Sequence, residues 1–487
     1  MNREKTIIIG AGGAGEELLE ELIQKDKFYN YNIIGFIDDD DKKKNRFIHG
    51  KKIIGGLNQI PAIIKKENIT TVLIAIPSSS GELIRRIYSI CSRFSVKIKL
   101  IPRLSEIING SVNFDHIKDI SVEDLLGRSA INQDFENAHE EMNNKTVLVS
   151  GAAGSIGSEL CKQCLFLAPR KIICVDQWEN GIFYLQKNLE NVVQTCNFEV
   201  KTEIKYQIGD IRDKEKINYI FNKFKPNIVF NAAAYKHVPL MESNIDQAIL
   251  NNINGTKNLC EATINENVEK FVLISTDKAV NPTNVMGATK RITEKLMHYY
   301  SSKSTKTKFS AVRFGNVLNS NGSVIPTFQE QIKKGTLTIT HKDIIRYFMT
   351  ITEAAQLVLQ CWSQSNGNEI FILDMGEPIK ILDLAKLMIR LRGFEPYKDI
   401  DIKIVGLRPG EKLYEELLTD VEQVNTTTNK KISIVSKEEE FDHVEFFDKV
   451  KEIIKDCKKQ NIVKLKERLK ELVPTYVELN SKEYCKK

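Results

Sequence analysis

The sequence predicts an α/β protein with two doubly wound parallel sheets, the second of which carries a smaller C-terminal lobe. Short apolar strands alternate with amphipathic helical segments along most of the chain, as they do in parallel sheets. At Gly10 and again at Gly151, a strand runs directly into a glycine-rich loop that opens a helix. A chain of 487 residues is also long enough for two or more domains with separate hydrophobic cores.

Residues 1–101 form the first predicted domain. A strand at 6–9 leads into the loop Gly-Ala-Gly-Gly-Ala-Gly at 10–15, which opens an amphipathic helix that runs through Ile23. Further strands are expected at 33–37, 71–76 and 96–100. A GxGxxG pattern between a strand and a helix is typical of nucleotide binding. No catalytic set accompanies it, so a Rossmann-like domain that serves regulation or assembly without a cofactor is the alternative.

Residues 102–144 are polar and are interpreted as a connector with a short helix near 122–126. The pattern then begins again, and residues 145–430 are interpreted as a second Rossmann-like domain with its lobe. Its loop has glycines three residues apart, which lets the backbone approach a pyrophosphate while the helix N-terminus offers free N–H groups. The loop residues predicted to bind a dinucleotide are Gly151, Ala153, Gly154, Ser155, Ile156 and Gly157.

Three further strand ends indicate which dinucleotide binds. Asp176 ends the strand after the loop, where a carboxylate accepts hydrogen bonds from the adenosine ribose and repels a 2′-phosphate. No arginine stands in the loop after Asp176 to offset that repulsion, so NAD is favoured over NADP. The residues expected to contact adenine, or to let the flat cofactor lie close, end the next two strands: Asp210, Ile211, Ala232, Ala233 and Ala234.

The strand at 271–274 is followed by side chains that suit acid–base chemistry. Thr276, Asp277 and Lys278 come directly after it, and Met286 and Lys290 lie on the next predicted helix. Because reaction groups gather at the carboxyl ends of strands in open α/β sheets, this segment indicates catalysis rather than binding alone. An adjacent acid and amine can share an elimination, one giving a proton and the other taking one.

Composition argues against several other classes of protein. The net charge of +6 comes from scattered lysines, which indicates a solvated surface rather than a nucleic-acid-binding face. Nine cysteines without disulfide spacing, no signal peptide and no apolar run of roughly 20 residues predict a cytoplasmic protein with reduced thiols. Seven scattered histidines lack metal-ligand spacing, so no metal is expected. Residues 431–487 are predicted to form a helical tail that packs on the lobe or mediates assembly.

The order of motifs is similar to that of a known family. The motifs lie at 150–157, 232–239, 275–279, 313–318 and 407–412. In this set the chain resembles the extended short-chain dehydrogenase/reductases that act on nucleotide sugars. More narrowly, it resembles the large, configuration-retaining UDP-N-acetylglucosamine 4,6-dehydratases of bacterial polysaccharide biosynthesis. Large members usually carry an N-terminal Rossmann-like domain preceded by membrane helices, which this sequence lacks, and a homo-oligomer is expected by the same resemblance.

The resemblance implies an internal redox cycle on UDP-N-acetylglucosamine. NAD takes hydride from C4 of the sugar, the ketone acidifies the C5 hydrogen, water leaves from C6, and hydride returns to C6. We expect Asp277 to be the acid that releases water and Lys278 the base at C5. This requires burial to raise the pKa of Asp277 and to lower that of Lys278, with Lys290 depressing the latter further. Lys290 is also expected to bind the nicotinamide ribose, and Thr276 to relay a proton from the 4-oxygen to Asp277.

Met286 marks a departure from the superfamily. A tyrosine base normally stands four residues before Lys290, and a thioether cannot take a proton. The large retaining dehydratases look the same at this position, so retention of the C5 configuration is favoured. A C5-inverting dehydratase and a UDP-sugar 4-epimerase are the nearest alternatives, although an epimerase needs no acid at C6. A non-catalytic nucleotide-sugar sensor or scaffold is the alternative from another class, which the loss of the tyrosine favours.

A further group of residues is predicted to bind the substrate. Arg346 and Arg408 are candidates for the diphosphate because guanidinium forks match phosphate oxygens, although each could be a structural ion pair. His237 stands where substrate and nicotinamide would meet, but a lone histidine is often only a packing residue. The full set is Lys236, His237, Asn316, Arg346, Arg408 and Glu411.

Overall fold

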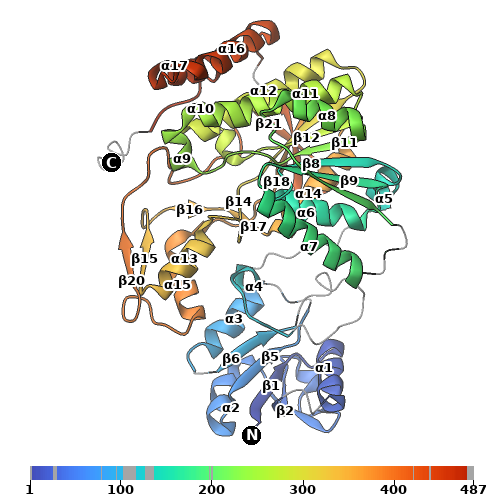
Figure 1. Cartoon of the computed structure of the whole chain (residues 1–487). Coiled ribbons are helices and arrows are strands. Elements are labelled where there is room, and N and C mark those ends of the chain that lie inside the picture. The colour runs from blue at the N-terminus through green and yellow to red at the C-terminus, as the bar shows by residue number, and fades with distance from the viewer. Residues whose placement is uncertain are drawn as a thin grey trace. The chain divides into compact units, whose positions relative to one another are not determined.

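The chain divides into two compact units, each with its own sheet (Figure 1). Unit 1 comprises Met1–Asn132 and Leu387–Lys398, and unit 2 comprises Gln133–Lys386 and Asp399–Lys487. The computed structural model describes residues 3–25, 30–77, 79, 81–94, 96–101, 117–126, 136–196, 198, 201–419, 422–437 and 440–479. The residues predicted as a connector at 102–144 are thus divided between the two units, and much of that stretch lies outside the described residues.

Unit 1 has a seven-stranded sheet with the order β3-β4-β2-β1-β5-β6-β7. Its inner strands β4, β2, β1, β5 and β6 are parallel, and β3 and β7 pair antiparallel at the two edges. The strands are β1 (Glu4–Ile9), β2 (Tyr31–Ile37), β3 (Phe47–Ile48), β4 (Lys51–Gly55), β5 (Thr71–Ile74), β6 (Lys97–Leu100) and β7 (Lys118–Asp119). The helices are α1 (Gly13–Gln24), α2 (Ile60–Glu67), α3 (Gly81–Cys91) and α4 (Val122–Leu126). The strands and helices predicted from the sequence lie within two residues of these bounds.

Unit 2 has a nine-stranded sheet with the order β10-β9-β8-β11-β12-β13-β18-β22-β21. The first seven strands are parallel, and chain order reverses on either side of β8, so the carboxyl ends of β8 and β11 flank a crevice. The parallel strands are β8 (Thr146–Ser150), β9 (Lys171–Asp176), β10 (Glu203–Ile208), β11 (Ile228–Asn231), β12 (Lys270–Ile274), β13 (Lys308–Arg313) and β18 (Glu369–Leu373). The helices that connect or cover them include α6 (Ser155–Phe166), α7 (Glu179–Thr195), α8 (Lys214–Phe224), α11 (Gly255–Asn265), α12 (Val285–Lys303) and α14 (Ile351–Gln364).

A smaller lobe follows β13 and is built from short strand pairs and two helices. The pairs are β14 (Asn316–Val317) with β17 (Phe348–Met349), β15 (Thr336–Ile339) with β20 (Asp401–Ile404), and β16 (Ile345–Arg346) with β19 (Ile379–Lys380). The helices are α13 (Val324–Lys333) and the first part of α15 (Ile381–Leu391), whose residues from Leu387 on belong to unit 1. Each of these pairs is local to the lobe, so the lobe forms one wall of the site rather than an extension of the large sheet.

The tail differs from the purely helical segment that the sequence predicted. β22 (Ile432–Lys437) pairs antiparallel with β18 and with β21 (Gln423–Thr426), because its alternating apolar residues fit the sheet edge. The helices α16 (His443–Asp456) and α17 (Ile462–Leu472) then follow (Figure 1). Their apolar residues, including Phe446, Val450 and Leu469, belong to the same core as α12. The tail helices therefore pack on the large sheet's helical layer, not on the lobe.

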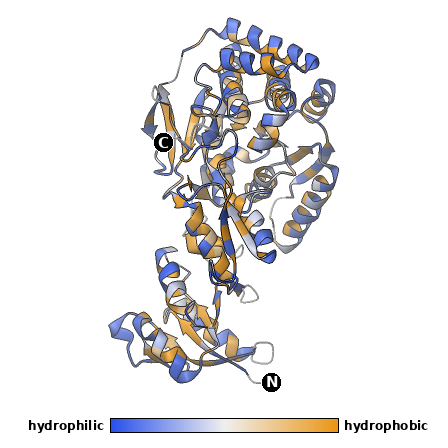
Figure 2. Cartoon of the chain, turned by 90° about the vertical axis from the view of Figure 1, so that its left-hand side faces the viewer, coloured by the Kyte–Doolittle hydropathy of each residue, from blue (hydrophilic) through white to orange (hydrophobic). Residues whose placement is uncertain are grey.

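Hydrophobic residues are concentrated on the strands, and hydrophilic residues on the outer faces of the surface helices (Figure 2). In unit 2, strands such as β8, β11 and β12 are buried along their whole length, as expected for a parallel sheet covered on both faces. Within the described ranges, no helix is both long enough and apolar enough to cross a membrane.

Candidate active site

A cavity of about 750 Å³ lies in unit 2 at the carboxyl ends of the parallel strands. It is walled on one side by the glycine loop and α6, and on the other by the lobe. The predicted site residues that line it are Gly154, Ser155, Ile156, Gly157, Ala232, Ala234, Lys236, His237, Thr276, Lys278, Met286, Lys290, Asn316, Arg346, Arg408 and Glu411. A smaller cavity of about 130 Å³ is lined by Gly151, Asp176, Asp210, Ile211 and Ala233. The fold thus gathers nearly all of the predicted residues into two adjoining cavities.

The loop between β8 and α6 is held in a shape that only glycine allows. Gly151 has φ +69°, and a Cβ there would lie 2.5 Å from the backbone N of Ala233. A Cβ on Gly157 would lie 2.1 Å from the carbonyl oxygen of Gly151. The Asp176 carboxylate accepts hydrogen bonds from the backbone N–H groups of Ala153 (3.0 Å) and Trp178 (2.9 Å). This carboxylate therefore fixes the conformation of the loop.

Asp210 and Arg212 add a feature that the sequence did not predict at this end of the site. The Arg212 guanidinium donates to both oxygens of Asp210 at 2.5 to 3.0 Å, and its Nη2 lies 3.5 Å from Oε1 of Gln177, beside Asp176. Burial would raise the pKa of Asp210, but these hydrogen bonds outweigh it and lower the pKa. An arginine thus lies near Asp176 after all, although its charge is paired with Asp210.

The glycine loop of unit 1 has the same arrangement as the loop at Gly151. The backbone N–H of Ala11 donates to Asp38 at 2.9 Å, as that of Ala153 does to Asp176. A Cβ on Gly15 would lie 2.0 Å from the carbonyl oxygen of Gly10, as one on Gly157 would from Gly151. The two glycine loops therefore share the geometry of a nucleotide-binding fold.

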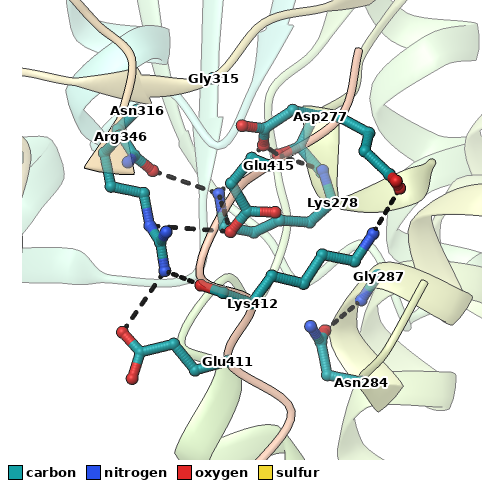
Figure 3. A network of polar contacts seen from close by, with 12 residues as sticks. Asp277, Lys278, Asn284, Gly287, Gly315, Asn316, Arg346, Glu411, Lys412 and Glu415 are labelled. Atoms are coloured by element: carbon teal, nitrogen blue, oxygen red, sulfur yellow. Dashed lines mark hydrogen bonds and ion pairs between the residues drawn. The ribbon is translucent and has the colours of Figure 1, made fainter. Parts of the chain in front are cut away.

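The residues predicted to react follow β12, with Thr276 as the N-cap of the 3-10 turn η6 (Asp277–Ala279). The hydroxyl of Thr276 donates to Oδ1 of Asp277 at 2.8 Å. Nζ of Lys278 donates to the same oxygen at 3.0 Å (Figure 3). Lys278 also donates to Oδ1 of Asn316 at 3.1 Å. Thr276 and Lys278 line the cavity, whereas Asp277 is 2% exposed and lies behind them. A proton can therefore pass between the cavity and Asp277 through either neighbour.

The expected depression of the Lys278 pKa is wrong. Burial does lower this pKa, but the negative charges of Asp277 and Glu415 outweigh it, and the pKa is raised above its ordinary value. The opposing cation is Arg346 and not Lys290. Lys290 is the amine with a strongly lowered pKa, at about 8, because it is buried with only the charge of Glu294 in opposition. Its Nζ donates to the carbonyl oxygen of Ile274 at 2.6 Å, beneath the cavity.

The N-terminus of α12 carries Met286 into the cavity wall. The side chain of Asn284 caps the helix by accepting from the N–H of Gly287 at 2.8 Å, and donates to the carbonyl oxygen of Gly410 at 3.1 Å. Met286 is 3% exposed and lines the cavity. A group that cannot exchange a proton therefore stands one helical turn before Lys290.

Every nitrogen of the Arg346 guanidinium contacts an oxygen of the protein. Its Nη atoms donate to the carbonyl oxygens of Ile345 (2.8 Å), Lys412 (2.8 Å) and Leu413 (3.2 Å). Its Nη2 lies 3.5 Å from Glu411 and its Nε 3.7 Å from Oε1 of Glu415 (Figure 3). A diphosphate could bind Arg346 only by displacing these acceptors. The arrangement instead fastens the loop at 411–415 to β16.

Arg408 is the arginine left for a diphosphate. It lines the cavity, is exposed, and its guanidinium has no hydrogen bond or ion pair with another described residue. Lys236 and His237 also line the cavity after β11. Partial desolvation and then the charge of Lys278 lower the pKa of Lys236, and desolvation and then Lys236 lower that of His237. In the part of the chain that is described, no three His, Cys, Asp or Glu residues are grouped so that they could hold a metal ion.

Glu415 is a site residue that the sequence reasoning missed. It lines the cavity, and its Oε1 lies 3.8 Å from Nζ of Lys278. It stands three residues after the motif at 407–412, between the exposed residues Tyr414 and Glu416. Nothing in this local pattern distinguishes it from a surface acid.

A buried ion network lies directly behind the reaction groups. Arg313, at the end of β13, pairs with Glu294 of α12 at 2.8 Å and with Glu422 at 2.8 Å, and all three side chains are fully buried. Arg291 bridges the same two carboxylates at 3.1 Å each. The hydroxyl of Ser275, next to Thr276, donates to Glu294 at 2.6 Å. The network thus joins the three segments that carry Thr276 to Lys278, Met286 to Lys290, and Asn316.

Residues 147–437, more than half of the chain, match the family model described as polysaccharide biosynthesis protein. The chain belongs to this family. One relative is the capsular polysaccharide biosynthesis protein CapD of Staphylococcus aureus, which is 44% identical to this protein. The match covers 86% of this chain and 69% of the CapD chain. Residues 1–102 match a second model, described as a CoA-binding domain.

Two further relatives cover somewhat more than half of this chain. A UDP-N-acetylglucosamine 4,6-dehydratase (inverting) of Campylobacter jejuni is 34% identical over 57% of this chain and 78% of its own. The crystal structure of Pen from Bacillus thuringiensis is 34% identical and covers 62% of this chain and 90% of its own, with a TM-score of 0.54. This likeness supports the fold found for unit 2.

Proposed function

We propose that this polysaccharide biosynthesis protein is an NAD-dependent 4,6-dehydratase of UDP-N-acetylglucosamine that retains the C5 configuration. The observation that carries the proposal is the hydrogen-bonded set Thr276, Asp277 and Lys278 at the wall of a cavity that adjoins a dinucleotide-type glycine loop. An acid and an amine beside each other suit the loss of water from C6 and of a proton from C5. The Campylobacter relative, named for the same substrate, supports the choice of sugar.

The cofactor fits the residues of the two cavities. Backbone N–H groups at the N-terminus of α6 face the position of a pyrophosphate, and Asp176 stands at the position of the ribose. Bound NAD would accept hydride from C4 and return it to C6. Lys290, with its Nζ beneath the cavity, is placed to hydrogen-bond the nicotinamide ribose.

The proton movements balance without a tyrosine. The 4-hydroxyl passes its proton to the oxygen of Thr276, which passes its own proton to Asp277 across the 2.8 Å hydrogen bond. Asp277, now neutral, gives a proton to the departing 6-hydroxyl, again through its neighbours at the cavity wall. Lys278 must first lose its own proton to solvent, because Asp277 and Glu415 raise its pKa; the free amine then takes the proton from C5 and later returns it to the same carbon. Because the same group removes and replaces the proton, the C5 configuration is retained.

A single assay tests the proposed reaction. Purified protein is incubated with UDP-N-acetylglucosamine in deuterated water without added NAD, and the product is analysed by NMR. We expect a 6-methyl group and deuterium at C5. A parallel sample in ordinary water, with the ketone reduced by borohydride, should show the H4–H5 coupling of the retained sugar. Unchanged substrate, with bound NAD verified in the same sample, would contradict the proposal and favour a sensor or scaffold.

The inverting dehydratase is the second candidate, because the Campylobacter relative is named as inverting. The coupling pattern of the same product decides between the two. A 4-epimerase would instead give UDP-N-acetylgalactosamine without a 6-methyl group. On the resemblance, we also propose a cytoplasmic homo-oligomer, which size-exclusion chromatography with light scattering would test.

Gly157→Ala should remove bound NAD. Its Cβ would lie 2.1 Å from the carbonyl oxygen of Gly151, so the loop must open and withdraw its N–H groups from the pyrophosphate. We expect less than a tenth of the wild-type NAD per chain, measured by chromatography after denaturation. Ser158→Ala is the matched control on the same helix, since it loses only a hydrogen bond to the Ser155 carbonyl oxygen. Full NAD occupancy in Gly157→Ala would show that the cofactor does not use this loop.

A further inference from the structure

Glu415 is an acidic residue of the cavity that the reaction as written leaves without a role. Its side chain is 6% exposed, and its Oε1 lies 3.8 Å from Nζ of Lys278 and 3.7 Å from Nε of Arg346. The residues on either side of it, Tyr414 and Glu416, are exposed. A carboxylate that loses its water in this way gives up hydration energy, which its two cation neighbours must offset.

The backbone around Glu415 is held so that this side chain faces inward. Arg346 accounts for the hold, because it donates to the carbonyl oxygens of Lys412 and Leu413 and so ties the loop to β16. The N–H of Ile345 adds a third bond to the carbonyl oxygen of Leu413 at 3.1 Å. The loop conformation, and with it the direction of Glu415, is therefore set by the lobe and not by local sequence.

We propose that Glu415 is a positioning residue that keeps the Lys278 amine between itself and Asp277, facing the substrate. The proposal deepens the dehydratase function and rests on it. Three oxygens then surround Nζ of Lys278, from Asp277 (3.0 Å), Asn316 (3.1 Å) and Glu415 (3.8 Å) (Figure 3). They come from three segments that are far apart in the chain.

Glu415 also strengthens Lys278 as a base. When the C5–H bond breaks, its electron pair forms the C5–C6 double bond, the C6–O bond breaks toward a proton from Asp277, and Lys278 becomes an ammonium ion. Glu415 stabilises that ion. The charged groups that face Lys278 are Asp277 and Glu415, which raise its pKa, Arg346, which lowers it, and Lys236, whose own pKa Lys278 lowers.

Glu415→Gln removes one negative charge while keeping the shape of the side chain. Without it the pKa of Lys278 should fall by roughly one unit or more, as expected for the loss of an opposite charge at this distance. At pH 8 the free-amine fraction of Lys278 should then rise about tenfold. The control is Glu416→Gln, because Glu416 is exposed, does not line the cavity, and pairs with Lys412 at 2.8 Å and Asn281 at 3.3 Å rather than with Lys278.

The test measures acetylation of Lys278 by a trace of acetic anhydride at pH 8, by peptide mass spectrometry on the full chain without sugar substrate. The exposed Lys333 serves as the internal standard. We expect about tenfold more acetylation of Lys278 in Glu415→Gln and no change in Glu416→Gln. Equal acetylation of Lys278 in wild type and Glu415→Gln would overturn the proposal.

The pH dependence of turnover is a second measurement. It would not shift if Glu415 had only a structural role. In Glu415→Gln, the pH at which the rate rises should shift to a lower value, because Lys278 loses its proton more easily. The plateau above that pH should fall, because the amine is then a weaker base. A rate that falls equally at every pH would contradict the assignment. If wild type forms no 4-keto sugar, the proposed function fails, whereas the acetylation result still decides the role of Glu415.

Discussion

Lys278→Ala should abolish formation of the 4-keto sugar while NAD stays bound. The variant removes the amine assigned to C5, and no other amine lies within hydrogen-bonding reach of both Asp277 and Asn316 among the described residues. Loss of a general base typically costs 10²- to 10⁴-fold, so we expect kcat to fall by roughly that factor. The measurements are the NMR assay for product and the NAD content of the purified variant.

Two further variants show whether Lys278 acts as a base or only as a positive charge. Lys278→Arg keeps a positive charge, but a guanidinium does not lose its proton in proteins, so this variant should be as inactive as Lys278→Ala. Lys333→Ala, on the exposed face of α13, should turn over at the wild-type rate. Turnover of Lys278→Ala within tenfold of wild type would remove Lys278 from the reaction.

Arg313→Met should destabilise unit 2 more than any surface substitution. Arg313 is fully buried and is paired with Glu294 and Glu422, so its loss leaves two buried carboxylates with only Arg291 as counterion. Removing one partner of a buried ion pair costs about 3–5 kcal/mol, because the remaining charge is not compensated. The free energy of unfolding should fall by about that amount at pH 7.

The chain offers a selective probe for this measurement. Its two tryptophans, Trp178 and Trp362, both lie in unit 2, and Trp362 is fully buried. Tryptophan fluorescence during urea unfolding therefore reports on unit 2. Lys333→Met, which removes an exposed ion pair with Glu330, is the control and should cost about 0–1 kcal/mol. A loss of the same size in both variants would contradict the role given to the network.

The free energy of unfolding should depend on pH differently in wild type and in Arg313→Met. Burial would raise the pKa of Glu294, but Arg313 and its other partners lower it to about 2, and they also lower that of Glu422. A carboxyl with a lowered folded-state pKa stabilises the fold above its ordinary pKa and loses that stabilisation as the pH falls toward the lowered value. The difference between wild type and Arg313→Met should thus be largest at neutral pH and shrink between pH 4.5 and about 2.

The sequence alone located strands such as β1, β2 and β12, the glycine loops, Asp176 and the segment from Thr276 to Lys278, but not the inner strands β4 and β18. These features are local, because a strand, its loop and the following helix form within one βα unit whose residue pattern specifies it. The strand β22 was missed, because a short apolar alternation in a charged tail is a weak signal until a free sheet edge is present to pair with it.

The charge state and the partners of those residues were decided by tertiary structure. Glu415 is distant from Lys278 in sequence, yet together with Asp277 it raises the pKa of Lys278 and so reverses the direction expected from burial, whereas Arg346 lowers that pKa. Likewise, the guanidinium of Arg346 donates hydrogen bonds to backbone carbonyl oxygens, and these donors are therefore not free for a diphosphate. A pKa depends on distances between charges and on the loss of water around them, and the amino-acid order specifies neither until the chain has folded.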